Sequence, residues 1–471
     1  MDRPTNPITA FCPRRGRSSE EARERTNLAD KTRDGLLFAG FMCGTSLDGV
    51  DGALIHICQG KIDLLSYAHH SFPTDLTDWI REFLSGTNTG MSVLECWGDL
   101  ENLLSETETD LMSRLCSTAN VSPEEIDGAG THGITAFHLP LPHPPPWVTN
   151  ERTTVSGVTI QMANPYRLSQ KFGIPVVFDF RKADVSLGGE GAPLATLFHR
   201  AAFSDPYETR AFLNLGGIAN LTYLPATSLG GHNSLSFDTG PGNMLLDLAV
   251  SHMTRGAQRY DKNGETSASG KSRKAVVDFL LKDPWFSKPP PKSTGREQWG
   301  KERFARLLSF LETQAPIPNS DLLASLSETT AAGILAGLRW LDRPPALLII
   351  GGGGSYNTDL VNRISRLTSI PTTTTERFGW SPQAIESMAF AYLAALTLSG
   401  RPCSLPSTTG CHSPAIGGSI APPQDGSLPA RLREICRAAE THLPFPDRAT
   451  LPGSRHPGSE HLFSGETGKH Q

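Results

Sequence analysis

The sequence lacks any hydrophobic run long enough to cross a membrane. Its longest mainly apolar segment covers residues 388–398 (MAFAYLAALTL), about half of the ~20 residues that a bilayer-spanning helix needs. The first 35 residues mix Arg14 and Arg15 with Glu20 and Glu21 and contain no apolar segment. This composition excludes a secretory signal and argues against a mitochondrial presequence. We therefore expect a cytoplasmic protein that makes no membrane contact.

Paired cysteines and an excess of basic residues are also missing. The eight cysteines are scattered without a CxxC pair, which excludes a disulfide framework or zinc ribbon and fits reduced thiols in the cytoplasm. The chain has 43 Lys and Arg against 48 Asp and Glu and a net charge of −5, so no basic field points to nucleic acid. With 38% hydrophobic residues in 471 positions, the chain is too apolar to be wholly disordered and long enough for more than one domain.

Two similar series of apolar segments are present, about 175 residues apart. The first has strand-like runs at 36–42, 50–58 and 62–66, followed by helical spacing over 74–118. The second has strand-like runs at 211–215, 218–224 and 234–237. In both, a small polar turn separates the first two runs. The repetition predicts two similar α/β lobes whose turns line a shared cleft.

Glycine-rich turns follow three of the predicted strands. They are GTSLDGVD (44–51), LGGIAN (215–220) with DTGPGN (238–243), and GGGG (351–354). Small residues let backbone N–H groups approach phosphate, and carboxylates such as Asp48 and Asp238 can hold Mg²⁺. The first segment alone fits an ordinary hairpin turn equally well, because Asp-Gly is common there. Three such turns, each directly after a strand, favour a nucleotide held between the lobes.

Two further segments have more than one reading. Asp179 ends the strand-like run 174–180, where a general base can sit, although an ordinary cap is the simpler reading from this segment alone. Residues 264–272 (GETSASGKS) resemble a P-loop, but five residues instead of four separate Gly264 from Gly270, and no strand precedes them. We expect a loop there, before a helix that starts near Ser272.

Taken in order, the motifs resemble the anhydro-N-acetylmuramic acid kinases. The resemblance covers residues 36–421 and rests on GTSLDGVD (44–51), DFR (179–181), GGEGAPL (188–194), LNLGGIAN (213–220), DTGPGNMLLD (238–247), PPPKSTGRE (289–297) and GGGGSYN (351–357). It implies the two-lobed α/β fold of the actin, hexokinase and Hsp70 ATPases, with duplicated βββαβα-type domains. We expect lobe I at 36–136 plus 408–421 and lobe II at 137–407. Residues 1–35 would be a disordered extension, and 422–471 a mostly disordered tail with one short helical pattern at 428–441.

The resemblance also implies a reaction. The family opens a 1,6-anhydro sugar with water and moves the γ-phosphate of ATP to O6, with Mg²⁺. By position, Asp179 matches the catalytic aspartate that deprotonates the water. Residues matching the ATP and phosphate site are Gly44, Thr45, Ser46, Leu47, Asp48, Gly49, Val50, Asp51, Gly216, Gly217, Asp238, Gly240, Gly242, Asn243, Gly352, Gly353, Gly354 and Asn357.

Other expected roles rest on weaker matches. Asp48 and Asp238 would hold Mg²⁺ through bound water, and His132, Arg181 and Glu328 would face the sugar. From its closeness in sequence, Arg181 is also expected to help keep Asp179 ionised. The resemblance implies a homodimer that acts on a small anhydro sugar and ATP.

Several residues depart from the family's usual motifs. Cys43 replaces a serine, Ile134 replaces the glutamine of HGQT, Glu190 replaces the glutamine of GGQGAPL, and Asn164 replaces the aspartate of QIGDP. Because several of these segments are expected near the sugar, a levoglucosan or other anhydro-sugar kinase is the first alternative. An ATP hydrolase of the same fold and a sugar- and ATP-binding protein without catalysis are the others. The presence of Asp179, Asp238 and the glycine turns favours an active kinase.

Overall fold

The computed structural model describes residues 34–44, 46–86, 92–140, 142, 156–229 and 234–444. Most of the expected N-terminal extension (1–33), Thr45 of the first glycine turn, and residues 445–471 lie outside this part of the chain. Within the described ranges, no helix combines the length and apolar character that a bilayer crossing requires.

The first sheet has six strands in the order β13-β7-β4-β1-β2-β3. Strands β1 (Leu36–Met42), β2 (Gly49–Cys58) and β3 (Lys61–Ser71) form an antiparallel meander, and β4 (Gly128–Thr131) and β7 (Val176–Phe178) continue the sheet in parallel. β13 (Ser419–Ala421) pairs antiparallel with β7 at the edge. β1 is buried along its whole length, because side chains on both of its faces enter hydrophobic cores. This explains its unbroken apolar sequence.

The second sheet repeats this plan in the order β10-β9-β8-β11-β12. Strands β8 (Arg210–Leu215), β9 (Ile218–Leu224) and β10 (Leu235–Pro241) form the antiparallel meander, and β11 (Leu347–Gly351) and β12 (Thr372–Thr374) add in parallel. The order matches β3-β2-β1-β4-β7 strand for strand. The duplicated topology confirms the predicted two-lobed α/β fold of the actin, hexokinase and Hsp70 type.

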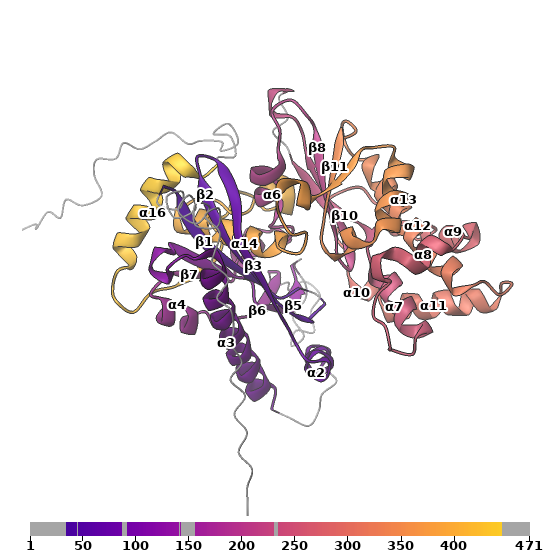
Figure 1. Cartoon of the computed structure of the whole chain (residues 1–471), viewed down its shortest axis with the longest axis horizontal. Coiled ribbons are helices and arrows are strands. Elements are labelled where there is room, and N and C mark those ends of the chain that lie inside the picture. The colour runs from indigo at the N-terminus through magenta and orange to yellow at the C-terminus, as the bar shows by residue number, and fades with distance from the viewer. Residues whose placement is uncertain are drawn as a thin grey trace, which may run out of the picture.

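Helices cover the sheets and join the lobes. α14 (Ile385–Leu398) lies directly on the first sheet, where a Cβ at Gly40 would come 2.0 Å from the Ser387 carbonyl oxygen and one at Gly130 would come 2.3 Å from that of Phe390. Figure 1 shows α7 to α13 grouped with the second sheet, beside the body that contains the first. The remaining elements are α2 (Thr74–Leu84), α3 (Val93–Ala119), β5 (Ile134–Leu139), β6 (Val158–Met162), α4 (Tyr166–Phe172), α5 (Lys182–Ser186), α6 (Thr196–Phe203), α7 (Met244–Met253), α8 (Glu265–Ser269), α9 (Lys274–Leu281), α10 (Arg296–Trp299), α11 (Lys301–Glu312), α12 (Asn319–Leu338), α13 (Thr358–Thr368), α15 (Pro406–Thr409) and α16 (Leu428–His442).

Sheet membership corrects the expected lobe boundaries. We expected residues 137–407 to belong to lobe II, but β7 is hydrogen-bonded into the first sheet, and α14 packs on that sheet's surface. After residue 136 the chain therefore stays in the first lobe through β7, leaves it for the second sheet from β8 to β12, and returns with α14 and β13. Strand pairing with distant partners decides this boundary, and local sequence patterns do not carry that information.

The expectation of a mostly disordered tail from residue 422 is also corrected. α16 buries Ile435 and Ala439, and Leu443 follows in the same hydrophobic core as α14. The Tyr392 hydroxyl donates a hydrogen bond to the Pro444 carbonyl oxygen at 3.1 Å. The segment 428–444 is thus part of the folded protein.

The expected loop at 264–272 is only partly a loop. Residues 265–269 form the short helix α8, and the following helix, α9, begins at Lys274. Ser267 is buried, and its backbone N–H donates to Asp261 at 2.9 Å. Tertiary contacts of this kind stabilise a helix too short to be predicted from its own sequence.

Candidate active site

Asp179 directly follows β7 and has a φ of +59°, a conformation that costs free energy for a residue other than glycine and that is concentrated at functional sites. Its Oδ2 lies 2.6 Å from Lys182 Nζ. Its Oδ1 is buried and has no hydrogen-bond partner among the described residues. Burial raises the pKa of Asp179, and Lys182 opposes this rise. The turn thus presents one carboxylate oxygen that is free to accept a proton.

Arg181 points away from Asp179. Its Nε donates to His132 Nε2 at 2.9 Å, and its Nη1 donates to the Gly191 carbonyl oxygen at 2.9 Å. The hypothesis that Arg181 keeps Asp179 ionised is therefore wrong, because the ion partner of Asp179 is Lys182. Alternate side chains on a tight turn point in different directions, which closeness in sequence does not reveal.

The buried imidazole of His132 is a neutral acceptor. Its Nδ1 lies 3.0 Å from the Gly133 carbonyl oxygen, so Nδ1 carries the proton, and Nε2 accepts from Arg181. Burial, followed by the charge of Arg181, lowers the pKa of His132 to about 3. The structure thus brings two of the predicted sugar-facing residues, His132 and Arg181, into direct contact beside Asp179.

Asp184 of α5 holds the loop 188–194, a role that the sequence analysis missed. Its Oδ2 accepts from the Gly191 backbone N–H at 2.7 Å, and its Oδ1 accepts from the Thr409 hydroxyl at 2.6 Å. A Cβ at Gly189 would lie 2.3 Å from Asp184 Oδ2, so this position requires glycine. The available signal was an aspartate shortly after Asp179, but its partners Gly191 and Thr409 cannot be read from the local sequence.

A cavity of about 100 Å³ lies between the loop 188–194 and the second lobe, lined among others by Glu190, Asp238 and Lys292. Burial raises the pKa of Asp238 to about 6, although its carboxylate accepts from Asn220 Nδ2 at 3.0 Å and from the Thr294 backbone N–H at 2.8 Å. Lys292 is buried, with Nζ 4.3 Å from the centre of the Trp285 ring, and burial lowers its pKa to about 8. The cavity therefore offers both donors and acceptors to a polar ligand.

The turn between β1 and β2 exposes two polar side chains. The Leu47 backbone N–H donates to the Gly44 carbonyl oxygen at 3.1 Å, and Leu47 has a φ of +55°. Ser46 and Asp48 are exposed and hydrogen-bonded to each other. Asp51 differs from them, because it already accepts hydrogen bonds from Tyr67 and His69 of β3.

Three glycine segments of the second lobe come together. The Gly216 and Gly217 carbonyl oxygens accept from the backbone N–H groups of Asn243 and Gly242, both at 2.9 Å. A Cβ at Gly354 would lie 2.8 Å from Asn243 Nδ2, and one at Gly352, whose φ is +78°, would lie 2.5 Å from Asn214 Oδ1. Gly240 (φ +133°) stands in the bulge of β10, and Gly353 is in the same turn as Gly354. The loops that we expected to cradle phosphate thus pack against one another at the start of α7.

The charge of Asp48 in the first glycine turn acts on two residues of the second lobe. Burial raises the pKa of Asp247 of α7 to about 7, and the charge of Asp48 adds to this rise. Burial lowers the pKa of Arg296, and the charge of Asp48 opposes this. The polar turn of the first sheet is therefore coupled electrostatically to the start of α7. The sequence analysis singled out neither Asp247 nor Arg296 as a binding residue.

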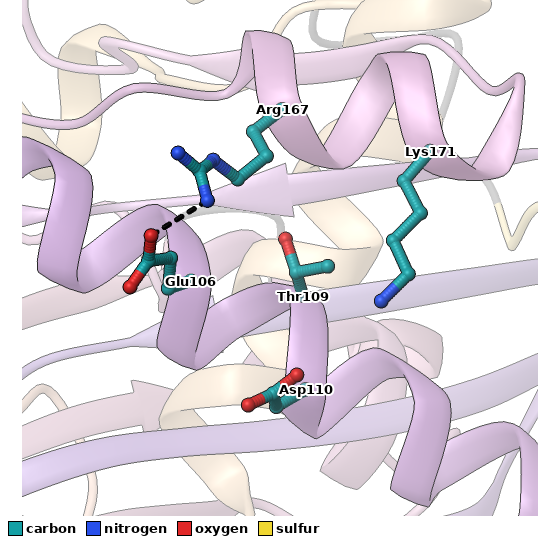
Figure 2. Close-up of a pocket in the computed structure, with 5 residues that line it drawn as sticks. All are labelled: Glu106, Thr109, Asp110, Arg167 and Lys171. Atoms are coloured by element: carbon teal, nitrogen blue, oxygen red, sulfur yellow. Dashed lines mark hydrogen bonds and ion pairs between the residues drawn. The ribbon is translucent and has the colours of Figure 1, made fainter.

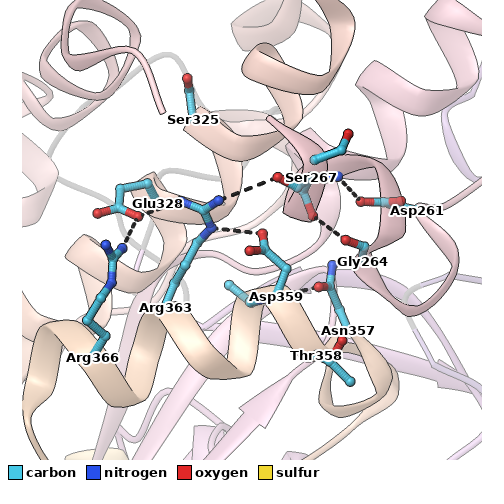
Figure 3. A network of polar contacts seen from close by, with 12 residues as sticks. Asp261, Gly264, Ser267, Ser325, Glu328, Asn357, Thr358, Asp359, Arg363 and Arg366 are labelled. Carbon is cyan, nitrogen blue, oxygen red and sulfur yellow. Dashed lines mark hydrogen bonds and ion pairs between the residues drawn. The ribbon is translucent and has the colours of Figure 1, made fainter. Parts of the chain in front are cut away.

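Glu328 and Asn357 both contact α13, at different points along the helix, as Figure 3 shows. Glu328 Oε2 accepts from Arg363 Nη1 at 2.8 Å and from Arg366 Nη2 at 2.7 Å. Asn357 caps α13, its Oδ1 accepting from the Leu360 backbone N–H at 2.9 Å. We expected Glu328 to face the sugar. It is instead bound by two arginines of α13 and shares no contact with Asp179, Arg181 or His132.

A second cavity, of about 420 Å³, lies outside this arrangement. Glu106, Thr109 and Asp110 of α3 and Arg167 and Lys171 of α4 line it (Figure 2). Arg167 Nη1 is 2.6 Å from Glu106 Oε1. None of the predicted site residues lines this cavity.

The described residues contain no cluster of three or more His, Cys, Asp or Glu side chains that would hold a metal ion by themselves. Cys43, beside the first glycine turn, is buried, and burial together with the charges of Asp48, Asp51 and Glu108 raises the pKa of its thiol. A protonated, buried thiol is a poor nucleophile. Cys43 therefore acts as packing in the core.

Comparison with known proteins supports one family. The family model for anhydro-N-acetylmuramic acid kinase matches residues 36–423. A protein of that name from Saccharophagus degradans is 35% identical over 82% of this chain and 99% of its own length. Those from Salinibacter ruber (36%) and Chromohalobacter salexigens (38%) also match over 82% of this chain, and over 96% and 99% of their own lengths.

Proposed function

This chain belongs to the anhydro-N-acetylmuramic acid kinase family, and we propose that it opens 1,6-anhydro-N-acetylmuramic acid with water and transfers the γ-phosphate of ATP to O6. The observation that carries the proposal is the buried, unpartnered Oδ1 of Asp179 on a turn with positive φ. The products are N-acetylmuramic acid 6-phosphate and ADP.

In the proposed reaction, Asp179 Oδ1 takes a proton from a water molecule whose oxygen bonds to the anomeric carbon. The bond from that carbon to the bridging oxygen breaks, and the electron pair stays on the oxygen as O6. O6 bonds to the γ-phosphorus, and the bond from phosphorus to the β-γ bridging oxygen of ATP breaks. The proton taken up by Asp179 is then released to solvent, and every other atom of sugar, water and ATP is present in the two products.

The glycine cluster would bind the triphosphate. Backbone N–H groups at Gly216–Gly217 suit phosphate oxygens, and α7, a helix of 10 residues, points the positive end of its dipole at the same cluster. Positioning and charge neutralisation provide most of the acceleration in phosphoryl transfer. Gly352, Gly353, Gly354 and Asn357 would lie along the adenosine.

Mg²⁺ fits this site when it accompanies ATP, since it is usually bound by one or two carboxylates, phosphates and water. It would neutralise charge on the phosphates. Two carboxylates are suitable for this. Asp48 is exposed on its turn, and Asp247 is influenced by the charge of Asp48. Asp238 is less suitable, because Asn220 and Thr294 already bond its oxygens.

The cavity beside Glu190 and Lys292 would receive part of the sugar. Glu190 stands where the family usually has an amide, and burial raises its pKa. The residues that differ from the family's motifs leave a levoglucosan kinase as the alternative. The relatives reported above are anhydro-N-acetylmuramic acid kinases by name, which favours the muramic acid sugar.

The test is ADP release with ATP and Mg²⁺, comparing 1,6-anhydro-N-acetylmuramic acid, levoglucosan, glucose and no sugar. Asp179→Asn should lower turnover by roughly 10²–10⁴-fold, the usual contribution of a general base, with ATP affinity retained. Asp278→Asn, at an exposed aspartate paired with Lys274, is the matched control. Turnover with levoglucosan alone would identify the protein as a levoglucosan kinase. ADP release without any sugar would identify it as an ATP hydrolase.

We also propose a homodimer located in the cytoplasm, as the family resemblance implies. Light scattering after size-exclusion chromatography and cell fractionation would test the two statements separately.

A further inference from the structure

Lys182 is the charged side chain that contacts Asp179. It is the first residue of α5, three positions after Asp179, and its Nζ lies 2.6 Å from Asp179 Oδ2. The Asp179 side chain is 11% exposed and that of Lys182 is 58% exposed. The ammonium therefore reaches from solvent to one side of a carboxylate that is otherwise shielded from water.

We propose that Lys182 is a positioning residue for the catalytic carboxylate: by binding Oδ2 it leaves Oδ1 facing the reacting water and keeps Asp179 ionised. This inference rests on the proposed function, because it assigns a role within the same proton transfer.

The other charged groups near this turn act elsewhere. Arg181 is bonded to His132 and Gly191, and His132 is neutral in this arrangement. Glu386 of α14 accepts from Asn214 and acts on Arg181. Asp184 of α5 is occupied by Gly191 and Thr409. Among the described residues, Lys182 is the charge that acts on Asp179, and it opposes the effect of burial.

The geometry separates the two oxygens of Asp179. The ion pair with Lys182 holds one oxygen at 2.6 Å and so fixes the orientation of the carboxylate plane, which leaves the other oxygen unpartnered. Without the ammonium, the carboxylate gains rotational freedom and burial acts unopposed on its ionisation. Both changes reduce the fraction of enzyme that is ready to accept a proton.

The experiment compares the pH dependence of kcat/KM, which reports the pKa of the free enzyme's base. In Lys182→Met the acid limb of the kcat/KM profile should move to higher pH, because the ammonium that favours the ionised carboxylate is gone. The expected shift is about half a unit to one unit for such a partly exposed pair. The value of kcat should fall several-fold, while the KM for ATP stays unchanged. Lys182→Arg keeps the charge and should retain the wild-type limb.

Lys274→Met is the matched control, because Lys274 forms an ion pair with Asp278 on the exposed face of α9. Its acid limb should equal that of the wild type. An unshifted acid limb in Lys182→Met, or an equal shift in Lys274→Met, would overturn the proposal.

A second measurement separates this proposal from the function itself. Carboxyl-¹³C aspartate labelling, with Asp179→Asn to assign the signal, follows the titration of Asp179 without any sugar. A higher pKa in Lys182→Met than in wild type supports the role of Lys182 even if no tested sugar is turned over. Equal values in the two proteins overturn it, whatever the sugar specificity.

Discussion

At the scale of single residues, the turn that carries Asp179 depends on neighbouring side chains whose charges are unusual. His132 is buried and neutral, and it accepts a hydrogen bond from the Arg181 guanidinium. Protonating this imidazole would place two positive charges in contact and remove the acceptor. The pair therefore links the shape of the turn to the pH of the solution.

Acidification should weaken folding through His132. Burial lowers its folded pKa to about 3, below the ordinary value of about 6.5. As pH falls below about 6.5, the unfolded chain binds a proton that the folded protein does not, so stability is lost from there down towards pH 3. Each such histidine adds up to about 1.4 kcal/mol per pH unit to the slope of the free energy of unfolding against pH. Urea unfolding between pH 4.5 and 7 measures this slope.

In His132→Gln, which keeps an acceptor, the slope should be smaller by about that amount. His252→Gln replaces an exposed histidine and should leave it unchanged. Identical slopes in the wild type and His132→Gln would contradict this account. His199, whose pKa burial also lowers to about 3, should maintain part of the pH dependence in both variants.

At the scale of elements, neighbouring glycines in the second lobe differ in how much room they leave for a side chain. A Cβ on Gly354 would lie 2.7 Å from Leu215 Cβ and 2.8 Å from Asn243 Nδ2, whereas one on Gly353 would meet nothing within 4 Å. Neither glycine has a positive φ. The two neighbours therefore differ in crowding and not in backbone conformation.

Gly354→Ala should weaken ATP binding by roughly tenfold, because overpacking of this kind costs about 1–3 kcal/mol and displaces Asn243 at the start of α7. Gly353→Ala should bind ATP within about twofold of wild type. Isothermal titration with a non-hydrolysable ATP analogue measures both, with melting temperatures as a control for folding. Equal affinities in the two variants would show that the loop is not part of the nucleotide site.

At the scale of the whole molecule, the C-terminal region stabilises the first lobe. α16 lies against the core that contains α14, and the Gly60 backbone N–H donates to the His442 carbonyl oxygen at 2.9 Å. Arg401 Nη2 donates to the Ala439 carbonyl oxygen at 2.9 Å. These contacts join the hairpin of β2 and β3 to residues almost 400 positions later.

Deleting residues 425–471 should therefore lower the melting temperature markedly, although the sequence alone predicts a dispensable tail. Burial of Ile435, Ala439 and Leu443 is worth several kcal/mol at about 1.5–3 kcal/mol for each large side chain. A chain that ends at Pro444 retains them and should melt close to the full-length protein. Equal melting of both truncations would contradict the packing role of α16.

Local patterns predict the strands and glycine turns well, because each is a short segment whose residues determine its conformation. Gly216–Gly217 between two apolar runs is an example. The partner of Asp179 was missed, since the positive φ of that turn sends Arg181 towards His132 and leaves Lys182 for the carboxylate. The role of Asp184 and the packing of α16, whose helical pattern the sequence does predict, were missed for a related reason: their partners, Thr409 and α14, lie far away along the chain.

The edge position of β13 has a consequence for how the enzyme is made. Asp179 follows β7, and β7 lies between β4 and β13, the latter formed by Ser419–Ala421. During synthesis the chain emerges N-terminus first, so the strand that precedes Asp179 waits for its last neighbour until more than 400 residues have been translated. A ribosome-bound nascent chain would hold all three glycine turns before it holds a completed first sheet. Under the proposed function, every segment of the nucleotide site is thus translated before the sheet that positions Asp179 can be completed.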